Sequence, residues 1–140
     1  MGHIKKLIIA AYVLILLMML SDCKKESNLS EKEKLTVSHG WRCHKINIDG
    51  VEGIVSNPWE LDDCWTFNSD KTFIYSYGSF RSPTMHQDDF KGSWYLSENE
   101  SLLNYSSTTQ KLENITLNNM VLSSSMEGYS RTYTYIPCSK

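Results

Sequence analysis

The sequence predicts an all-β domain, an eight-stranded antiparallel up-and-down β-barrel that follows an N-terminal signal helix and a flexible tether. Three observations predict it. From residue 40 onward, short β-like segments alternate with turn residues roughly every 8 to 12 positions. No helical period of useful length occurs in the same stretch. Neighbouring segments are joined by short links, which favour up-and-down pairing, and closure of the sheet removes its exposed edges.

The first residues have the organisation of an export signal. Lys5 and Lys6 precede an unbroken apolar run over residues 7–20, and Cys23 follows it. As a helix this run spans about 21 Å, whereas the hydrocarbon core of a bilayer is about 30 Å thick. The run is therefore short for a membrane span and is typical of the apolar region of a signal peptide. An uncleaved membrane anchor is the alternative interpretation.

The residues around Cys23 resemble the lipobox of bacterial lipoproteins. Leu20, Ser21 and Cys23 match that pattern, while Asp22 stands where the family usually has a small residue. The resemblance implies that Cys23 becomes the first residue of the mature chain and carries fatty acyl groups such as palmitate, which anchor it in a membrane. Lys24 takes the place of the aspartate that retains some lipoproteins at the inner membrane. We therefore expect a lipid anchor in the outer membrane, with the periplasmic and the surface face both open.

These features divide the chain into three parts. Residues 1–22 are the expected signal peptide, residues 23–39 a lipid-anchored flexible tether, and residues 40–140 the barrel domain. The tether is mostly charged or polar and buries too little apolar surface to order itself, although Ser30 and Glu33 match a helix capping box. The chain that remains after cleavage suits one domain. A net charge of -2 and the lack of a basic patch disfavour a nucleic-acid partner.

Each expected strand ends at turn residues. The first ends at Asp49 and Gly50, in a predicted loop over residues 49–61. The next two form a hairpin about the turn at residues 68–71, and alternation puts their aromatic side chains on one face. A later turn is expected near residues 108–109. The eight expected strands cover residues 41–48, 64–67, 72–77, 91–96, 101–107, 111–117, 120–126 and 129–136.

Four segments of this pattern resemble the lipocalin-like domains of lipoproteins from Bacteroidetes-type bacteria. They are Trp41, the hairpin over residues 62–73, the strand over residues 92–97 and the strand pair over residues 115–122. The resemblance covers residues 40–136. It implies a small eight-stranded β-barrel on a lipid anchor, and it implies no particular ligand.

Six aromatic residues are expected to face the barrel interior. The interior of an eight-stranded barrel is either filled by side chains or holds one small ligand, and each large aromatic side chain can bury about 150 to 250 Å². These residues are therefore candidates for ligand binding, with simple core packing as the alternative. Tyr129, Tyr133 and Tyr135 share one face of the last strand and extend either arrangement. The six candidates are Trp41, Trp65, Phe67, Phe73, Tyr75 and Trp94.

The cysteines predict one disulfide. If Cys23 is lipidated, Cys43, Cys64 and Cys138 remain in an oxidising compartment, and an odd number leaves one thiol free. In an up-and-down barrel the start of the first strand lies beside the end of the last strand, whereas Cys64 begins the second strand at the opposite end. We therefore expect a Cys43–Cys138 bridge that adds about 3 to 5 kcal/mol. The alternative is no bridge at all, because the required geometry is strict.

We expect no cofactor, no metal ion and no catalytic residue. The sequence contains no nucleophile elbow, no His-Glu-x-x-His motif and no glycine-rich phosphate loop. Zinc sites need three or four converging ligands, but the adjacent Cys43 and His44 point to opposite faces of a strand. Asp62 and Asp63 diverge for the same reason, which disfavours a pair of catalytic acids. The other metal-ligand candidates, without zinc-binding spacing, are His39, His86, Asp88 and Asp89.

Together these observations predict a non-enzymatic, lipid-anchored protein of the cell envelope whose barrel binds a small apolar or amphiphilic ligand. The alternative is a structural or interaction module, such as an accessory subunit of an envelope complex, with a filled barrel and an exposed apolar patch. The interior distinguishes the two, because a ligand site needs a cavity of at least about 300 Å³.

Overall fold

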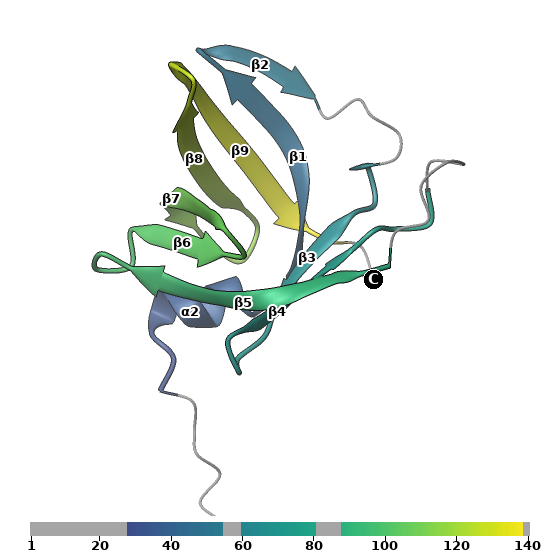
Figure 1. Ribbon diagram of the computed structural model, residues 1–140, viewed down its shortest axis with the longest axis vertical. Helices are drawn as coiled ribbons and strands as arrows, with labels where there is room; N and C mark the ends of the chain where they lie inside the picture. The colour runs from purple at the N-terminus through teal and green to yellow at the C-terminus, as the bar shows by residue number, and fades with distance from the viewer. Residues whose placement is uncertain (1–27, 55–59, 81–87, 139–140) are drawn as a thin grey trace, which may run out of the picture.

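The computed structural model describes residues 28–54, 60–80 and 88–138, so the predicted signal peptide and Cys23 lie outside the described residues. The described chain forms one short helix and nine strands (Figure 1). No helix in this part of the chain is long and apolar enough to cross a membrane. The elements are α2 (Glu31–Thr36), β1 (Gly40–Ile48), β2 (Val51–Ile54), β3 (Cys64–Phe67), β4 (Thr72–Ser76), β5 (Phe90–Ser97), β6 (Leu102–Tyr105), β7 (Thr108–Ile115), β8 (Met120–Met126) and β9 (Tyr129–Pro137).

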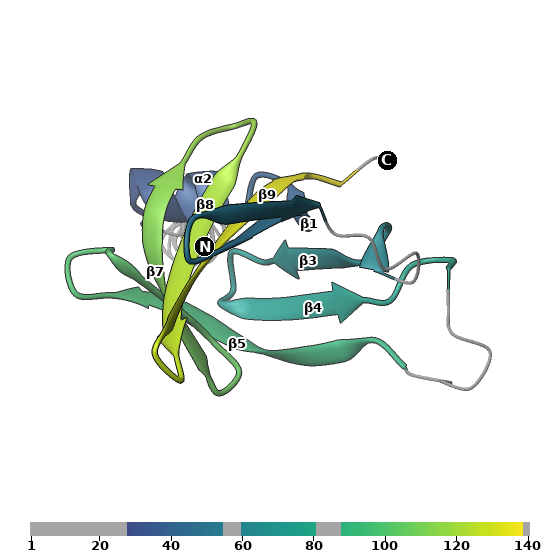
Figure 2. The ribbon, with the colours of Figure 1, turned by 90° about the horizontal axis from the view of Figure 1, so that it is seen from above.

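Eight of the strands close into an antiparallel ring. Hydrogen bonds run from β1 through β3, β4, β5, β6, β7 and β8 to β9, and β9 pairs again with β1. Seen from above, β3, β4 and β5 run across the direction of β7, β8 and β9 (Figure 2). The predicted fold class is therefore confirmed: the chain is an all-β antiparallel sheet whose hydrogen bonds run in a ring through eight strands.

The strand outside the ring, β2, lies in a segment that was predicted to be a loop. Asp49 and Gly50 form a two-residue turn with φ angles of 49° and 86°, the backbone conformation that suits a tight hairpin. The chain therefore folds straight back, and Ile48 pairs with Val51. The prediction of a loop over residues 49–61 was wrong for β2. Because β2 occupies the later part of one edge of β1, β3 pairs only with the first two residues of that strand.

The turn between β6 and β7 lies two residues earlier than predicted. Ser106 adopts a φ of 54°, so the chain reverses immediately after Tyr105, and Tyr105 pairs with Thr108. This register also pairs Leu103 with Gln110 and buries Gln110 on the inner face. A polar residue therefore enters the barrel interior.

Helix α2 belongs to the folded domain. Ser30 and Glu33 form a complete capping box, in which each side chain accepts a hydrogen bond from the backbone N–H of the other residue. A six-residue helix is not stable alone, and tertiary contacts supply the rest. Thr36 is fully buried, and its carbonyl accepts a 2.9 Å hydrogen bond from Nε1 of Trp41. The prediction that residues 23–39 form a flexible tether was therefore wrong for the helix; residues 23–27 lie outside the described residues.

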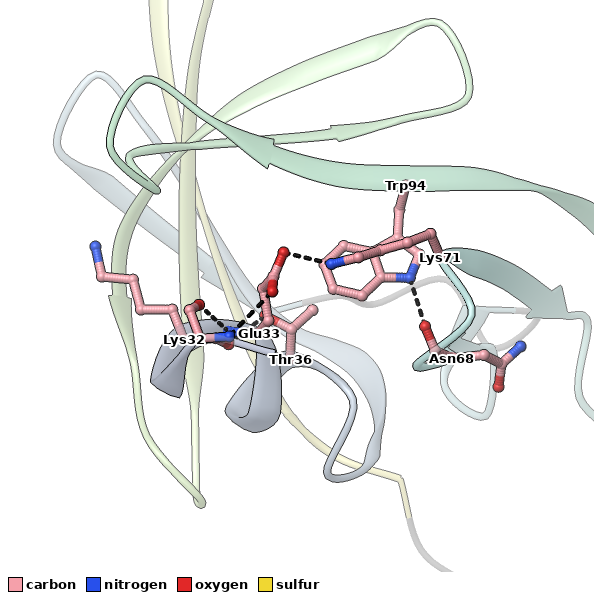
Figure 3. Close-up of polar contacts among 7 residues, drawn as sticks. Lys32, Glu33, Thr36, Asn68, Lys71 and Trp94 are labelled. Carbon is pink, nitrogen blue, oxygen red and sulfur yellow. Dashed lines mark hydrogen bonds and ion pairs between the residues drawn. The ribbon is translucent and has the colours of Figure 1, made fainter. Parts of the chain in front are cut away.

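Polar contacts hold the helix against the turns at one end of the ring (Figure 3). Glu33 forms an ion pair with Lys71 in the β3–β4 turn. Nζ of Lys71 also lies 4.5 Å from the centroid of the Trp94 ring, a cation–π contact. Burial opposes ionisation of Glu33, but the hydrogen bonds from Lys71 and from the Ser30 backbone outweigh it and lower the pKa of this carboxyl.

One disulfide joins Cys64 to Cys138, with 6.2 Å between their Cα atoms, and Cys43 is free. The predicted Cys43–Cys138 bridge was therefore wrong. The reason is the register around Gly40, which pairs with Thr66 of β3 and accepts a 2.8 Å hydrogen bond from the backbone N–H of Cys138. Both bonded cysteines thus lie beside Gly40, and a Cβ at that position would clash with Sγ of Cys64.

Candidate functional site

The inner face of the ring can be followed from strand to strand through the pairing register. Residues directly opposite each other in an antiparallel pair point to the same side of the sheet. Trp41 pairs with Trp65, and Trp65 pairs with Tyr75, so their three side chains share the inner face. Two further rows cross β1, β9, β8 and β7: one contains Cys43, Tyr135, Met120 and Ile115, and the other contains Ile46, Tyr133, Leu122 and Leu112.

The structure brings the six predicted aromatic residues together inside the ring, but in two environments. Four of them are buried in the core, where core packing accounts for them; the ring centroids of Phe67 and Trp94, for example, are 5.6 Å apart. Trp65 and Tyr75 are only half-buried. These two are therefore the predicted residues that a ligand can reach. The buried four are Trp41, Phe67, Phe73 and Trp94.

Trp65 lies at the centre of a group of packed aromatic rings on the inner face. Its ring centroid lies 4.4 Å from that of Tyr75 and 5.5 Å from that of Phe73, both on β4. It also lies 4.9 Å from the ring of Tyr105 on β6, so the aromatic packing extends to a strand that is not a neighbour of β3. Aromatic pairs at such separations contribute about 0.5 to 1.5 kcal/mol each beyond area burial. Packing on several sides therefore holds the half-exposed indole in place.

A chain of hydrogen bonds crosses the interior next to Trp65. The hydroxyl of Tyr135 donates to that of Tyr105, which in turn donates to Oε1 of Gln110 at 2.6 Å. Burial raises the pKa of Tyr105 to about 12, so this phenol is neutral at physiological pH. Sequence reasoning identified neither Tyr105 nor Gln110. Alternation after Leu103 could have placed Tyr105 inside, but Gln110 depended on the position of the turn.

Cys43 faces the same interior as a half-buried free thiol. It lies opposite Tyr135 in the ladder between β1 and β9. Burial, followed by the negative charge of Glu60, raises the pKa of Cys43 to about 11. The group is therefore a neutral thiol at physiological pH and behaves as a small apolar side chain.

Asp62 and Asp63 organise the chain that follows β4. The carboxylate of Asp63 is buried and accepts hydrogen bonds from the Tyr75 hydroxyl and from the backbone N–H of Gly78. Burial raises the pKa of Asp63, although both hydrogen bonds favour its charged form. Asp62 accepts from the backbone N–H groups of Ser79 and Phe80. The two carboxylates therefore have different partners, although both residues precede β3 and do not lie on a strand.

The residues considered for a metal site are dispersed. The ring of His39 packs edge-on against Trp41, with 5.9 Å between centroids, and His44 is exposed on the strand that carries the half-buried Cys43. His86 lies outside the described residues. Within residues 28–54, 60–80 and 88–138, no three His, Cys, Asp or Glu side chains converge closely enough to hold a metal ion.

Exposure along the inner face shows where the ring opens. On β9, Tyr135 is buried, Tyr133 is half-buried and Tyr129 is 53% exposed. On β1, Trp41 is buried, whereas Ile48 is 44% exposed. Both gradients run toward the β1–β2 and β8–β9 turns, while α2 packs at the end that holds the β3–β4 turn. The accessible part of the interior is therefore the end away from the helix.

Comparison with known proteins gives one family. A family model described as a lipocalin-like domain matches residues 37–124, which include the half-buried Trp65 and Tyr75 and the strands from β1 to β7. Arg131, Tyr133 and Tyr135 of β9 lie beyond the matched residues. No curated protein and no solved structure matches the chain. The ring of eight antiparallel strands and the match over more than half of the chain together show that this protein belongs to the lipocalin-like domain family.

Proposed function

We propose that the protein binds one small apolar or amphiphilic molecule against the inner face of its barrel. The observation that carries the proposal is the half-buried aromatic wall formed by Trp65, Tyr75 and Tyr133. These side chains face the interior and yet keep exposed area, whereas their neighbours Trp41 and Tyr135 are buried. Covering apolar surface of this kind with a ligand contributes about 25 cal/mol of favourable binding free energy for each Å² removed from water.

The polar atoms of the wall favour an apolar ligand. The Tyr75 hydroxyl donates to Asp63, and the Tyr105 hydroxyl donates to Gln110. Because both of these donors already have acceptors within the protein, Tyr75 and Tyr105 offer mainly ring faces and edges to a ligand. A molecule with an aliphatic chain or a flat ring system suits this surface better than a sugar or a nucleotide, which would need several free polar partners.

The barrel can be tested directly for a bound molecule. The full chain carrying Cys23→Ser, purified from cells, is expected to show additional mass in native mass spectrometry that organic extraction removes. Added dodecyl maltoside or dodecanoate is then expected to change the tryptophan fluorescence. Trp65→Ala should weaken binding, whereas Tyr95→Ala, at an exposed position on β5, should not. Failure of every amphiphile to bind the folded protein would overturn the proposal.

We also propose that the protein is anchored by lipid on Cys23 at the outer membrane, facing either the periplasm or the outside. The basic start, the short apolar run and the lipobox-like residues 20–23 support this location, as does a disulfide, since disulfides persist in oxidising compartments. Cells fed labelled palmitate should incorporate it into the chain, and Cys23→Ser should abolish both the label and the membrane association. Retention of the variant in membranes would contradict lipid anchoring.

The role that we propose is not enzymatic. The interior thiol of Cys43 has a pKa near 11 and is therefore a poor nucleophile at neutral pH. The carboxylates of Asp62 and Asp63 are engaged by the backbone and by Tyr75. These residues stabilise the chain around the barrel opening and are not arranged to act on a substrate.

A second candidate function is an interaction module within an envelope complex. Leu61 and Phe80 favour it, because they are 43% and 61% exposed and because Asp62, next to Leu61, holds the backbone N–H of Phe80. Crosslinking in intact cells should then recover a partner protein, and Phe80→Ser should reduce the yield while the barrel stays folded. Recovery of the protein only as an isolated monomer would argue against this role.

A further inference from the structure

Arg131 is a positively charged residue on the inner face near the open end. β8 and β9 pair without a break from Met120 and Tyr135 to Met126 and Tyr129, so alternation along β9 puts Arg131 on the same face as Tyr133 and Tyr135. Arg131 pairs with Ser124 on one side and with Ile48 on the other. It therefore lies in the row next to Tyr133, on the way from the buried interior to the exposed Tyr129.

The guanidinium of Arg131 has no anionic partner in the described part of the chain. Its Nε atom is buried and has no hydrogen-bond acceptor, and a buried donor without an acceptor costs free energy. The carboxylate of Asp49, close by in the β1–β2 turn, accepts a 2.8 Å hydrogen bond from the backbone N–H of Ser130. The ion pairs among the described residues are Lys34–Glu31, Lys45–Glu52, Lys71–Glu33 and Lys111–Glu113.

The surroundings of Arg131 on the inner face are largely apolar. Ile48 lies beside it in the same row, and the next row inward contains Ile46, Tyr133 and Leu122. Beyond them, the hydroxyl of Tyr135 hydrogen-bonds to that of Tyr105, and the ring of Tyr105 packs against Trp65. The positive charge of Arg131 thus lies at the outer edge of a continuous apolar and aromatic surface. The complementary molecule carries its negative charge at one end and an apolar chain at the other.

We propose that the barrel takes a single-chain amphiphile with a carboxylate head, whose head pairs with Arg131 and whose chain lies along Tyr133 toward Trp65. This inference rests on the proposed ligand-binding function and names its ligand class. The planar guanidinium presents N–H donors side by side, a spacing that matches the two oxygens of a carboxylate. The proposed ligand also supplies the anionic partner that the guanidinium of Arg131 lacks in the described part of the chain.

The test is a calorimetric titration of the full chain carrying Cys23→Ser at pH 8, with three amphiphiles of equal chain length below their micelle concentrations. Dodecanoate is expected to bind at least tenfold more tightly than dodecyltrimethylammonium, with neutral dodecyl maltoside between them. Arg131→Gln should weaken dodecanoate binding by about tenfold or more, the effect of losing a charge-assisted hydrogen bond, and should leave dodecyl maltoside unchanged. Lys91→Gln removes an exposed positive charge on β5 and should change neither affinity.

The outcomes separate this inference from the function on which it rests. If dodecanoate and dodecyl maltoside bind equally well, or if Arg131→Gln weakens neither, the carboxylate assignment is overturned while ligand binding stands. If no amphiphile binds the folded wild-type barrel, both proposals fail. Should Arg131→Gln unfold, Arg131→Lys keeps the charge but loses the planar fork. This variant is expected to bind dodecanoate with intermediate affinity, and wild-type affinity would contradict a bidentate contact.

Discussion

The two ends of the barrel bury their aromatic side chains to different extents. At the end covered by α2, the indoles of Trp41 and Trp94 are buried, and their N–H groups donate to the carbonyls of Thr36 and Asn68. Toward the open end, Tyr133 is half-buried, Tyr129 is exposed and Nε of Arg131 has no acceptor in the described chain. The difference indicates that the covered end stabilises the fold, whereas the open end keeps the exposed aromatic area and the charge that we propose for ligand binding.

The comparison is tested most strongly by removing one buried and one half-buried tryptophan. Trp94→Ala should lower the free energy of unfolding by about 3 to 5 kcal/mol, because it leaves a cavity in the core. Trp65→Ala should cost less, since the indole keeps part of its exposure in the native state, but it should weaken amphiphile binding. Urea unfolding followed by circular dichroism measures both. Equal destabilisation by the two substitutions would contradict the distinction between buried and half-buried aromatic residues.

The disulfide joins the start of β3 to the end of β9, and its removal should have the next largest effect on stability. Replacing Cys64 and Cys138 together by serine should lower the free energy of unfolding by about 3 kcal/mol, because the bridge closes a loop of 74 residues in the unfolded chain. Cys43→Ser is the matched control and should cost less. Peptide mapping under non-reducing conditions checks the pairing directly, and a linked peptide that contains Cys43 would contradict it.

The helix at the covered end should add a smaller, pH-dependent contribution. Glu33→Gln removes the ion pair to Lys71 and weakens the capping box, so we expect a loss of about 1 kcal/mol at pH 7. The pKa of Glu33 is lowered by folding from its ordinary value near 4.5. This stabilisation is therefore complete above about pH 4.5 and is lost as the pH falls through the lower value of the folded state.

The control for that measurement lies on the same helix. Glu31 pairs with Lys34 at the surface, and its side chain is 86% exposed, so Glu31→Gln should change the stability little. Thermal unfolding at several pH values between 3 and 7 separates the two variants. A wild-type advantage over Glu33→Gln that stays constant down to pH 3 would contradict the lowered pKa.

The smallest expected effect concerns the reactivity of the Cys43 thiol. With its pKa near 11, the thiol of Cys43 should react slowly with iodoacetamide at pH 7, and the rate should rise about tenfold per pH unit. The Cys23→Ser chain suits the measurement, because its remaining cysteines other than Cys43 are in the disulfide. Bound dodecanoate should slow the reaction further. A rate that levels off near pH 8.5 would indicate an ordinary, exposed thiol.

Much of the fold could be predicted from local patterns. The β3–β4 hairpin was predicted because the turn at residues 68–71 and the alternation of Trp65 and Phe67 are both contained in a short stretch. The same alternation placed the six predicted aromatic residues inside the ring. The capping box of Ser30 and Glu33 was also visible, but the segment was predicted to be a tether because it contains little apolar surface. The burial of Thr36, which holds the helix in place, depends on the finished barrel.

The sequence alone determined the fold class and most of the strands, because alternation and turn residues are local properties of the chain. Only the tertiary structure decided which cysteines meet, which aromatic residues keep exposed area, and that Arg131 lies on the inner face with no anionic partner among the described residues. Each of these depends on the register with which β1 meets β3 and β9. That register arises from contacts between residues far apart in the sequence, which no local pattern records.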